Sequence, residues 1–133
     1  MVPALALDTK KLAAKLKASI KPTPKIAGLP DMTLEELAAA ANDTYLLLGC
    51  RGIVFDMSSN SEAYGPGKGY NAFIGHDASV ALAKMEFGDD FMNPDKMHWK
   101  DLKKDELEQI DYWVEKFTEK YKIVGYIKDD WYH

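Results

Sequence analysis

The ten residues Tyr64–Phe73, YGPGKGYNAF, are the most informative stretch of this 133-residue sequence. Three glycines and one proline stand between its two tyrosines. Glycine permits positive φ and allows close approach of the backbone to a ligand, and proline stiffens a loop. We therefore predict an ordered loop over residues 58–69 that ends on Tyr70.

The second tyrosine, Tyr70, is predicted to stand where a helix over about residues 71–84 begins. A helix N-terminus has unpaired N–H groups and a partial positive charge, which favour an anionic group such as a phenolate. From spacing alone, a purely structural turn with flanking tyrosines is the commoner explanation. A phosphate loop is excluded because the GxxxxGK[ST] pattern is missing.

The elements on either side of the loop predict an α+β domain rather than an alternating βαβ series. Thr33 and Glu36 form a capping-box pattern for a helix that runs through Ala41. Apolar residues recur at three and four over Lys104–Phe117, which predicts an amphipathic helix. Two paired strands (residues 45–48 and 52–56), a surface excursion (88–100) and a last strand (121–127) complete the predicted order.

Composition is that of an ordinary globular chain, with 47% apolar and 29% charged residues. The single cysteine, Cys50, excludes an internal disulfide and fits a reducing compartment. It follows an apolar run, so we interpret it as a small buried residue rather than a nucleophile. We expect a cytoplasmic protein, or one at the cytosolic face of the endoplasmic reticulum.

Charge is unevenly distributed along the chain. Residues 1–29 hold six lysines and one aspartate, a net charge of +5. Because the whole chain carries a net charge of −4, residues 30–133 carry −9. An acidic body argues against nucleic acid as the main partner. We divide the chain into a basic leader and Pro-rich linker (1–28), one folded domain (29–128) and a short tail (129–133).

The leader has helical spacing over Asp8–Ile20. It could be a packed leader helix or a basic amphipathic segment lying on an anionic membrane. No stretch approaches the roughly 20 apolar residues that span a bilayer. The first seven residues do not resemble a secretory signal, because no charged region precedes them.

Three further motifs accompany the YGPG…YNAF loop (residues 64–73): the TLEEL helix start (33–37), GIVFD (52–56) and GHDAS (75–79). In these motifs and in their order, the sequence resembles the membrane-associated progesterone receptor family. The closing Trp113–Phe117, Lys120-Tyr121 and Val124-Gly125 agree with it. The resemblance implies a cytochrome b5-like haem/steroid-binding fold, a small mixed sheet with helices that form a haem cleft.

The family's site implies haem b with Tyr70 as the iron ligand and Tyr64 as its hydrogen-bonding neighbour. Lys120 and Tyr121 correspond to a Lys-Tyr pair that lines the site. Phenolate is a known haem ligand, and a hard anionic oxygen favours Fe(III) over Fe(II). Gly67 and Gly69 belong to the same loop, and Lys68 could reach a haem propionate or simply be solvated.

The sequence departs from the family pattern at three places: Lys68-Gly69, His76, which we expect in the helix after the loop, and the long 88–100 excursion. No His-Pro-Gly-Gly segment is present, so bis-histidine ligation is not expected. A sixth ligand could come from His98, Met85, Met92 or Met97, although surface or core positions suit them better. Trp113 and Phe117 are expected in the core rather than stacked on a cofactor.

We expect a haem-binding module that supports partners such as cytochrome P450 enzymes or carries haem, with a haem-stacked homodimer as one possible assembly. Two alternatives remain. One is an enzyme that uses the open haem face, or Tyr64, Lys120 and Tyr121 as acid–base groups without haem. The other is a haem-free steroid or hydrophobic-ligand binder. No Ser-His-Asp set or zinc-ligand spacing supports a hydrolase or a zinc enzyme.

Overall fold

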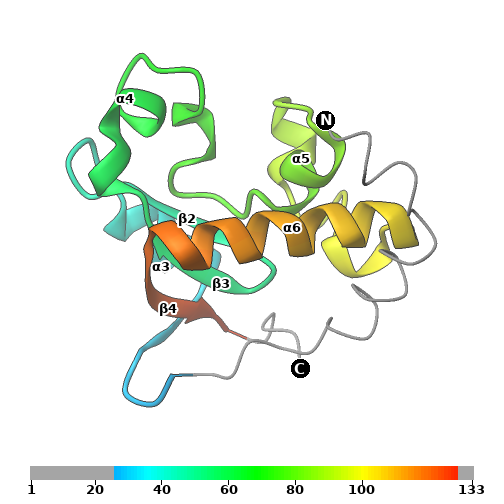
Figure 1. Cartoon of the computed structure of the whole chain (residues 1–133), viewed down its shortest axis with the longest axis horizontal. Coiled ribbons are helices and arrows are strands. Elements are labelled where there is room, and N and C mark those ends of the chain that lie inside the picture. The colour runs from blue at the N-terminus through cyan, green and yellow to red at the C-terminus, as the bar shows by residue number, and fades with distance from the viewer. Residues whose placement is uncertain (1–25, 129–133) are drawn as a thin grey trace.

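A four-stranded mixed sheet forms the centre of the computed structural model, which describes residues 26–128 (Figure 1). The strand order is β1-β4-β3-β2, with β1 parallel to β4 and the other neighbours antiparallel. The strands are β1 (Asp31–Met32), β2 (Leu47–Cys50), β3 (Ile53–Asp56) and β4 (Lys122–Ile127). The predicted leader helix Asp8–Ile20 and the tail 129–133 lie outside the described residues.

Among the described residues, four α-helices and several short 3-10 turns surround the sheet. The capping box predicted from the sequence opens α3: the Thr33 hydroxyl accepts from the Glu36 N–H at 3.0 Å, and the Glu36 carboxylate accepts from the Thr33 N–H at 2.9 Å. The helices are α3 (Leu34–Ala40), α4 (Ser61–Tyr64), α5 (Ser79–Lys84) and α6 (Lys104–Lys120). In Figure 1, α6 crosses the sheet, and α4 and α5 stand apart above it.

Side chains of the β2–β3 hairpin alternate between the two faces of the sheet, and each face packs in its own apolar cluster. Leu48 and Phe55 belong to the main core, which includes Ile110, Val114 and Phe117 of α6. On the opposite face, Leu47 and Val54 pack with Leu37 of α3 and Ile127 of β4. Neighbouring residues of a strand point to opposite faces of the sheet, so the same hairpin contributes side chains to both clusters.

The helix predicted over residues 71–84 is wrong in its middle. A 3-10 turn covers Asn71–Phe73, and α5 begins only at Ser79. Between them the chain runs along the edge of β2: the Gly49 N–H donates to the His76 carbonyl at 2.9 Å, and the Gly49 carbonyl accepts from the Ala78 N–H at 2.7 Å. The edge of β2 satisfies its backbone groups with this segment, so His76 lies in a turn and not in a helix.

The segment 88–100, predicted as a surface excursion, is partly built into the core. The Trp99 side chain is 2% exposed, and Phe91, Met92 and Met97 pack against the main core cluster. Two 3-10 turns, Asp89–Met92 and Trp99–Asp101, give the segment its shape. The sequence did not indicate the burial of Trp99, because the aromatic residues there follow neither a helical nor a strand period.

The prediction that Cys50 is buried is confirmed. It ends β2 and is fully enclosed in the main core. Burial raises the pKa of the Cys50 thiol, and the Asp77 carboxylate raises it further. The thiolate, which is the reactive form, is therefore suppressed at neutral pH.

Candidate functional site

The loop after α4 is closed by its own backbone hydrogen bonds. Gly65 ends α4 and donates its N–H to the Ser61 carbonyl at 2.8 Å, and a Cβ at this position would lie 2.5 Å from that oxygen. Farther along, the Tyr70 N–H donates to the Ala63 carbonyl at 3.0 Å. Gly67 has a φ of +78°, which favours glycine. The loop therefore folds back on α4 and sets Tyr70 beside Tyr64.

The two tyrosines of the loop have different environments. Tyr64 is buried at 5% exposure, whereas Tyr70 is 36% exposed, and their ring centroids are 5.5 Å apart. Burial raises the pKa of the Tyr64 phenol, with smaller contributions from Tyr121 and Tyr70. Tyr64 therefore keeps its proton across the physiological range and can act as a hydrogen-bond donor to an anionic neighbour.

Tyr64 joins two rows of aromatic rings. One row leads to Tyr70, whose ring stacks with Phe73 at 5.8 Å and contacts Phe87 at 6.1 Å. The other row leads through Tyr121, 6.3 Å from Tyr64, into α6. It continues through Phe117, Trp113 and Tyr112, with neighbouring centroids 5.7–5.9 Å apart. Rings at these distances attract one another, so packed and mostly buried rings connect Tyr70 to α6.

Among the predicted site residues, the structure brings Tyr64, Tyr70 and Tyr121 together. Tyr121 follows the last turn of α6, and its hydroxyl accepts a hydrogen bond from the Asn60 amide at 2.9 Å. The two lysines, Lys68 on the loop and Lys120 at the end of α6, are exposed. Gly67 and Gly69 are also exposed, and a Cβ on either would meet nothing within 4 Å.

The helix N-terminus expected behind Tyr70 is not present in the predicted form. Tyr70 precedes a 3-10 turn of three residues, so no long helix directs its dipole at the phenol. A single turn contributes few aligned peptide dipoles, and their effect falls off quickly. The environment of Tyr70 is instead defined by the surrounding rings.

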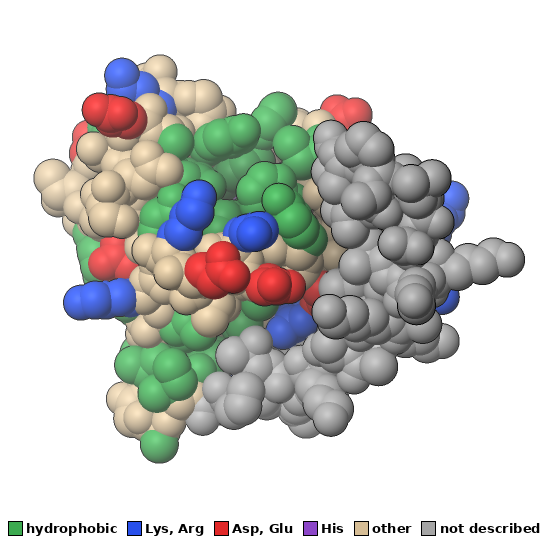
Figure 2. All heavy atoms as spheres, in the orientation of Figure 1, with side chains coloured by type: hydrophobic (Ala, Val, Ile, Leu, Met, Phe, Trp, Pro, Cys, Tyr) green, Lys and Arg blue, Asp and Glu red, His purple; other side chains and the backbone are tan. Residues whose placement is uncertain are grey.

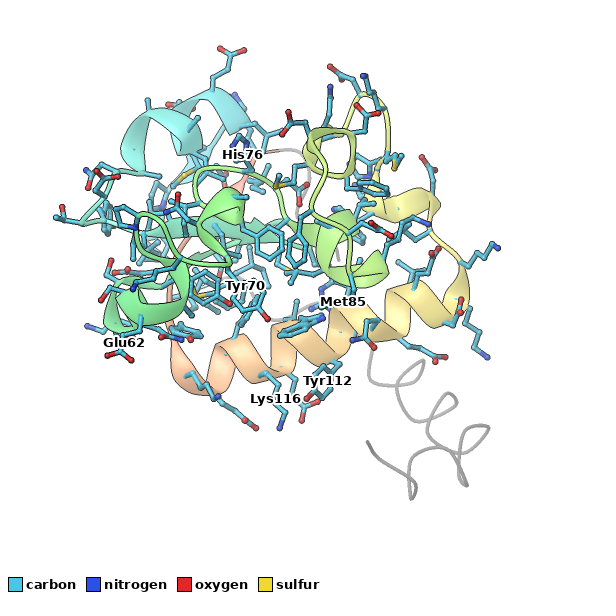
Figure 3. All side chains as sticks on the ribbon, turned by 90° about the horizontal axis from the view of Figure 1, so that it is seen from above. Glu62, Tyr70, His76, Met85, Tyr112 and Lys116 are labelled. Carbon is cyan, nitrogen blue, oxygen red and sulfur yellow. The ribbon has the colours of Figure 1, made fainter. Side chains whose placement is uncertain are left out.

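Apolar side chains gather above α6 between the α4 segment and α5, with charged side chains of both signs along α6 in front of them (Figure 2). Figure 3, seen from above, shows Tyr70 and Met85 over this helix, with Tyr112 and Lys116 on its outer side. Three exposed large apolar residues, Tyr70, Met85 and Phe87, come from these two segments. The site therefore offers an aromatic surface to a ligand, with one phenol at its edge.

His76 lies away from this surface. Figure 3 shows it on the side of α3, far from Tyr70, and it lines a hollow of about 250 Å³ with Ala38, Ala41 and Asn42. His98 stacks on Trp99, and its Nδ1 accepts from the Lys100 N–H at 3.1 Å. Within residues 26–128, no group of three or more His, Cys, Asp or Glu side chains could hold a metal ion.

Sequence reasoning missed the contributions of Phe73 and Phe87. Neither ring is among the site residues that the sequence predicts. Their centroids are 5.2 Å apart, and both rings contact Tyr70. The signal for Phe73 was its place three residues after Tyr70. No local signal identified Phe87, since it reaches the site from beyond α5. Trp113 and Phe117, expected in the core, pack in or against the main core cluster.

Comparison with known proteins agrees with this architecture. Residues 33–128 match the family model described as Cytochrome b5-like Heme/Steroid binding domain. The chain is 35% identical over 109 residues to the cytochrome P450 regulator dap1 of Schizosaccharomyces pombe, covering 77% of this chain and 65% of that protein. It is also 35% identical over 97 residues to membrane-associated progesterone receptor component 2 of Rattus norvegicus, covering 71% and 45%.

A solved structure from Arabidopsis thaliana, described as having a cytochrome b5 like fold, superposes with a TM-score of 0.66 at 30% identity. The match covers 79% of this chain and 96% of that one. The chain spans only part of the length of the curated relatives it matches: the first four matches cover 45–65% of those proteins. Within residues 26–128, no helix is both long and apolar enough to cross a membrane.

Proposed function

This chain belongs to the cytochrome b5-like haem/steroid-binding domain family, with relatives among the membrane-associated progesterone receptor components, and from that premise we propose that it binds haem b with Tyr70 as the iron ligand. The observation that carries the proposal is Tyr70 itself: a partly exposed phenol at the edge of an aromatic surface. Aromatic and apolar side chains with a few placed polar groups are the usual lining of a cofactor site.

The donor set fits ferric haem. A porphyrin supplies four nitrogen ligands of its own, so the protein needs to add only one axial donor and an apolar wall. A tyrosine oxygen is a known axial ligand of haem iron. Tyr70 presents such an oxygen on a side chain that is 36% exposed.

We assign Tyr64 the role of hydrogen-bond donor to the Tyr70 oxygen. Tyr64 is buried, its ring lies 5.5 Å from that of Tyr70, and its raised pKa keeps the hydroxyl protonated. A donor stabilises the charged form of its acceptor, so a protonated Tyr64 favours the phenolate form of Tyr70. Tyr121 continues the apolar wall on the side of α6.

We assign the exposed cations, Lys68 and Lys120, to the propionate groups. Lys68 lies two residues before Tyr70, and Lys120 directly precedes Tyr121. An exposed lysine that pairs with a carboxylate contributes about 0–1 kcal/mol, so each should tune affinity without determining it. Gly67 and Gly69 leave open space along the loop, where a side chain would otherwise stand.

When bound, the haem would supply a ferric centre whose anionic oxygen ligand favours Fe(III) over Fe(II). We therefore propose a supporting role for partner proteins rather than simple electron shuttling. One relative is named a cytochrome P450 regulator. Residues 30–133 carry a net charge of −9, which offers complementarity to a basic partner surface.

The test is titration of the purified chain with hemin, for wild type, Tyr70→Phe and Tyr112→Phe. Tyr112 is the matched control, because it is 43% exposed and its ring contacts Trp113 rather than Tyr70. We expect a Soret band and a phenolate-to-iron charge-transfer band in wild type and in Tyr112→Phe. Loss of the ligand in Tyr70→Phe should abolish the second band and weaken hemin binding about tenfold or more.

Identical spectra in wild type and Tyr70→Phe would disprove ligation by Tyr70. If wild type binds no hemin, titration of the same protein with a steroid distinguishes the haem-free binder. Intrinsic tyrosine and tryptophan fluorescence reports that binding, because aromatic rings line the proposed surface.

A further inference from the structure

Phe87 closes a cluster of three rings around the proposed ligand. Its centroid lies 5.2 Å from that of Phe73 and 6.1 Å from that of Tyr70, and the Phe73 and Tyr70 rings stack at 5.8 Å with planes 12° apart. Phe73 is buried, whereas Phe87 is 47% exposed. Phe87 is therefore the outer member of the cluster. Because its side chain remains about half exposed, the hydrophobic effect alone does not explain why it lies against Phe73 and Tyr70.

A backbone turn directly after α5 positions the Phe87 ring. Met85 ends the helix in the left-handed region, with φ 54° and ψ 46°, and the Glu86 N–H donates to the Ala81 carbonyl at 3.0 Å. A non-glycine residue adopts this conformation only where its surroundings favour it. The turn reverses the chain, so Phe87 returns toward Phe73 and Tyr70. The helix α5, from which the turn leaves, is fixed in the core by the buried side chains of Val80, Ala81 and Leu82.

A partly exposed tyrosine needs such a neighbour if its oxygen is to point in one direction. The buried rings of Tyr64 and Phe73 contact Tyr70 from the protein interior, and Phe87 adds a contact from an exposed segment. Ligands to a metal are held in productive orientation by the groups packed around them. Without Phe87, the Tyr70 side chain would gain rotational freedom at the surface.

Building on the proposed haem ligation, we propose that Phe87 is a positioning residue: it fixes the Tyr70 ring so that the phenol oxygen is directed for ligation before the ligand arrives. The segment after α5 thereby controls the ligand from a point seventeen residues away in sequence. Pre-organised donors bind with less loss of conformational entropy, so the contribution of Phe87 should appear in affinity and in the retention of the ligand.

The first test concerns the chain without hemin. Aromatic NMR resonances of Tyr70, assigned with Tyr70→Phe, should shift in Phe87→Ala because the neighbouring ring is lost, and NOEs between Tyr70 and Phe73 should weaken. Phe87→Trp should restore both the shift dispersion and the NOEs, whereas Phe87→Leu restores bulk without a ring. Tyr112→Ala removes an aromatic of similar exposure that contacts Trp113, and it should leave Tyr70 unchanged.

The second test loads the same variants with hemin. Dissociation of hemin into an excess of a tighter haem-binding protein should be about tenfold faster in Phe87→Ala than in wild type. The iron–phenolate band in the resonance Raman spectrum should broaden or shift, and Phe87→Trp should recover both. Denaturation midpoints measured in parallel show whether global stability has changed.

The outcomes separate this inference from the proposed function. If wild type binds no hemin, the proposed function fails, and the NMR arm still decides whether Phe87 positions Tyr70. If wild type binds hemin through Tyr70, yet Phe87→Ala has unchanged NOEs, dissociation rate and Raman band, the positioning role is disproved and the function stands.

Discussion

At the scale of single residues, burial decides the chemistry of groups with similar side chains. Tyr64 and Tyr70 are six positions apart in one loop, yet one is buried and the other is partly exposed. Burial disfavours the charged form of an acid, so Tyr64 remains a neutral donor. The same effect makes Cys50 an inert packing residue. Neither difference follows from the identity of the residue.

Raising the pH above about 9 should lower the free energy of unfolding. Burial raises the pKa of Cys50 and of Tyr64 above their ordinary values of 9.0 and 10.0, so the unfolded chain loses these protons before the folded chain does. Their contribution to stability is fully present below the unfolded pKa values and is lost as pH rises. Each group lowers the free energy of unfolding by at most about 1.4 kcal/mol per pH unit.

Urea denaturation at several values between about pH 8 and pH 10.5 measures this slope. Cys50→Ala should reduce the slope that begins near the thiol pKa, whatever it does to absolute stability. An equal slope in wild type and Cys50→Ala would contradict the assigned cause.

At the scale of elements, local signals specified where helices begin and where the tight hairpin turns. The box of Thr33 and Glu36 opens α3, and the apolar period over 104–117 became α6, which extends to Lys120. The hairpin turn is shorter than the connection predicted between strands 45–48 and 52–56, because Gly49 and Cys50 belong to β2. Arg51 and Gly52 both have positive φ, as the two central residues of a type I′ hairpin turn require.

The glycines of the tyrosine loop should differ sharply in their tolerance to alanine. A Cβ on Gly65 would stand 2.5 Å from the Ser61 carbonyl oxygen, so Gly65→Ala must open the end of α4 and displace the loop. We expect a loss of about 1–3 kcal/mol in the free energy of unfolding. Gly69→Ala is the matched control, because its Cβ would meet nothing within 4 Å.

Chemical denaturation of the two glycine variants gives the comparison directly, and hemin titration shows whether the displaced loop also impairs the proposed site. Equal stability of Gly65→Ala and Gly69→Ala would mean that the loop is not held by α4 in the way described.

At the scale of the whole molecule, one buried ion pair connects the hairpin to α6. The Arg51 guanidinium bonds the Asp111 carboxylate across 60 positions of sequence. The backbone N–H of Arg51 also donates to the Ser79 hydroxyl at 2.7 Å, which links the same turn to α5. Burial raises the pKa of Asp111, while Arg51 acts in the opposite direction. Through these two contacts, Arg51 links the hairpin turn to α6 and to α5.

Asp111→Ala should destabilise the domain by about 3–5 kcal/mol, because it removes the carboxylate that bonds the Arg51 guanidinium, which is buried at 5% exposure. The control is Asp90→Ala, which breaks the Lys96 pair at 2.8 Å, where both side chains are more than half exposed. Such a surface pair is worth about 0–1 kcal/mol.

Guanidinium denaturation of both single variants measures the difference. The double variant Arg51→Met with Asp111→Leu should recover much of the loss, since apolar residues can replace a buried ion pair. A loss in Asp111→Ala no greater than in Asp90→Ala would refute the argument.

What depends on neighbouring residues could be predicted from the sequence. The α+β class, the α3 capping box, the strand pairing, the long α6 and the family resemblance all rest on motifs of a few residues or on a regular period. The tyrosine loop belongs to this group as well, because its glycines, its proline and both tyrosines lie within ten positions.

Only the tertiary structure decided what depends on residues distant in sequence. The chain between residues 73 and 79 forms a turn and a bridge to the edge of β2, which needed hydrogen-bond partners, although its apolar spacing favoured a helix. Phe87 reached Tyr70 through the turn at Met85, and Arg51 met Asp111 across the molecule. Local propensity carries no information about such contacts, because their free energy arises only when separate elements pack together.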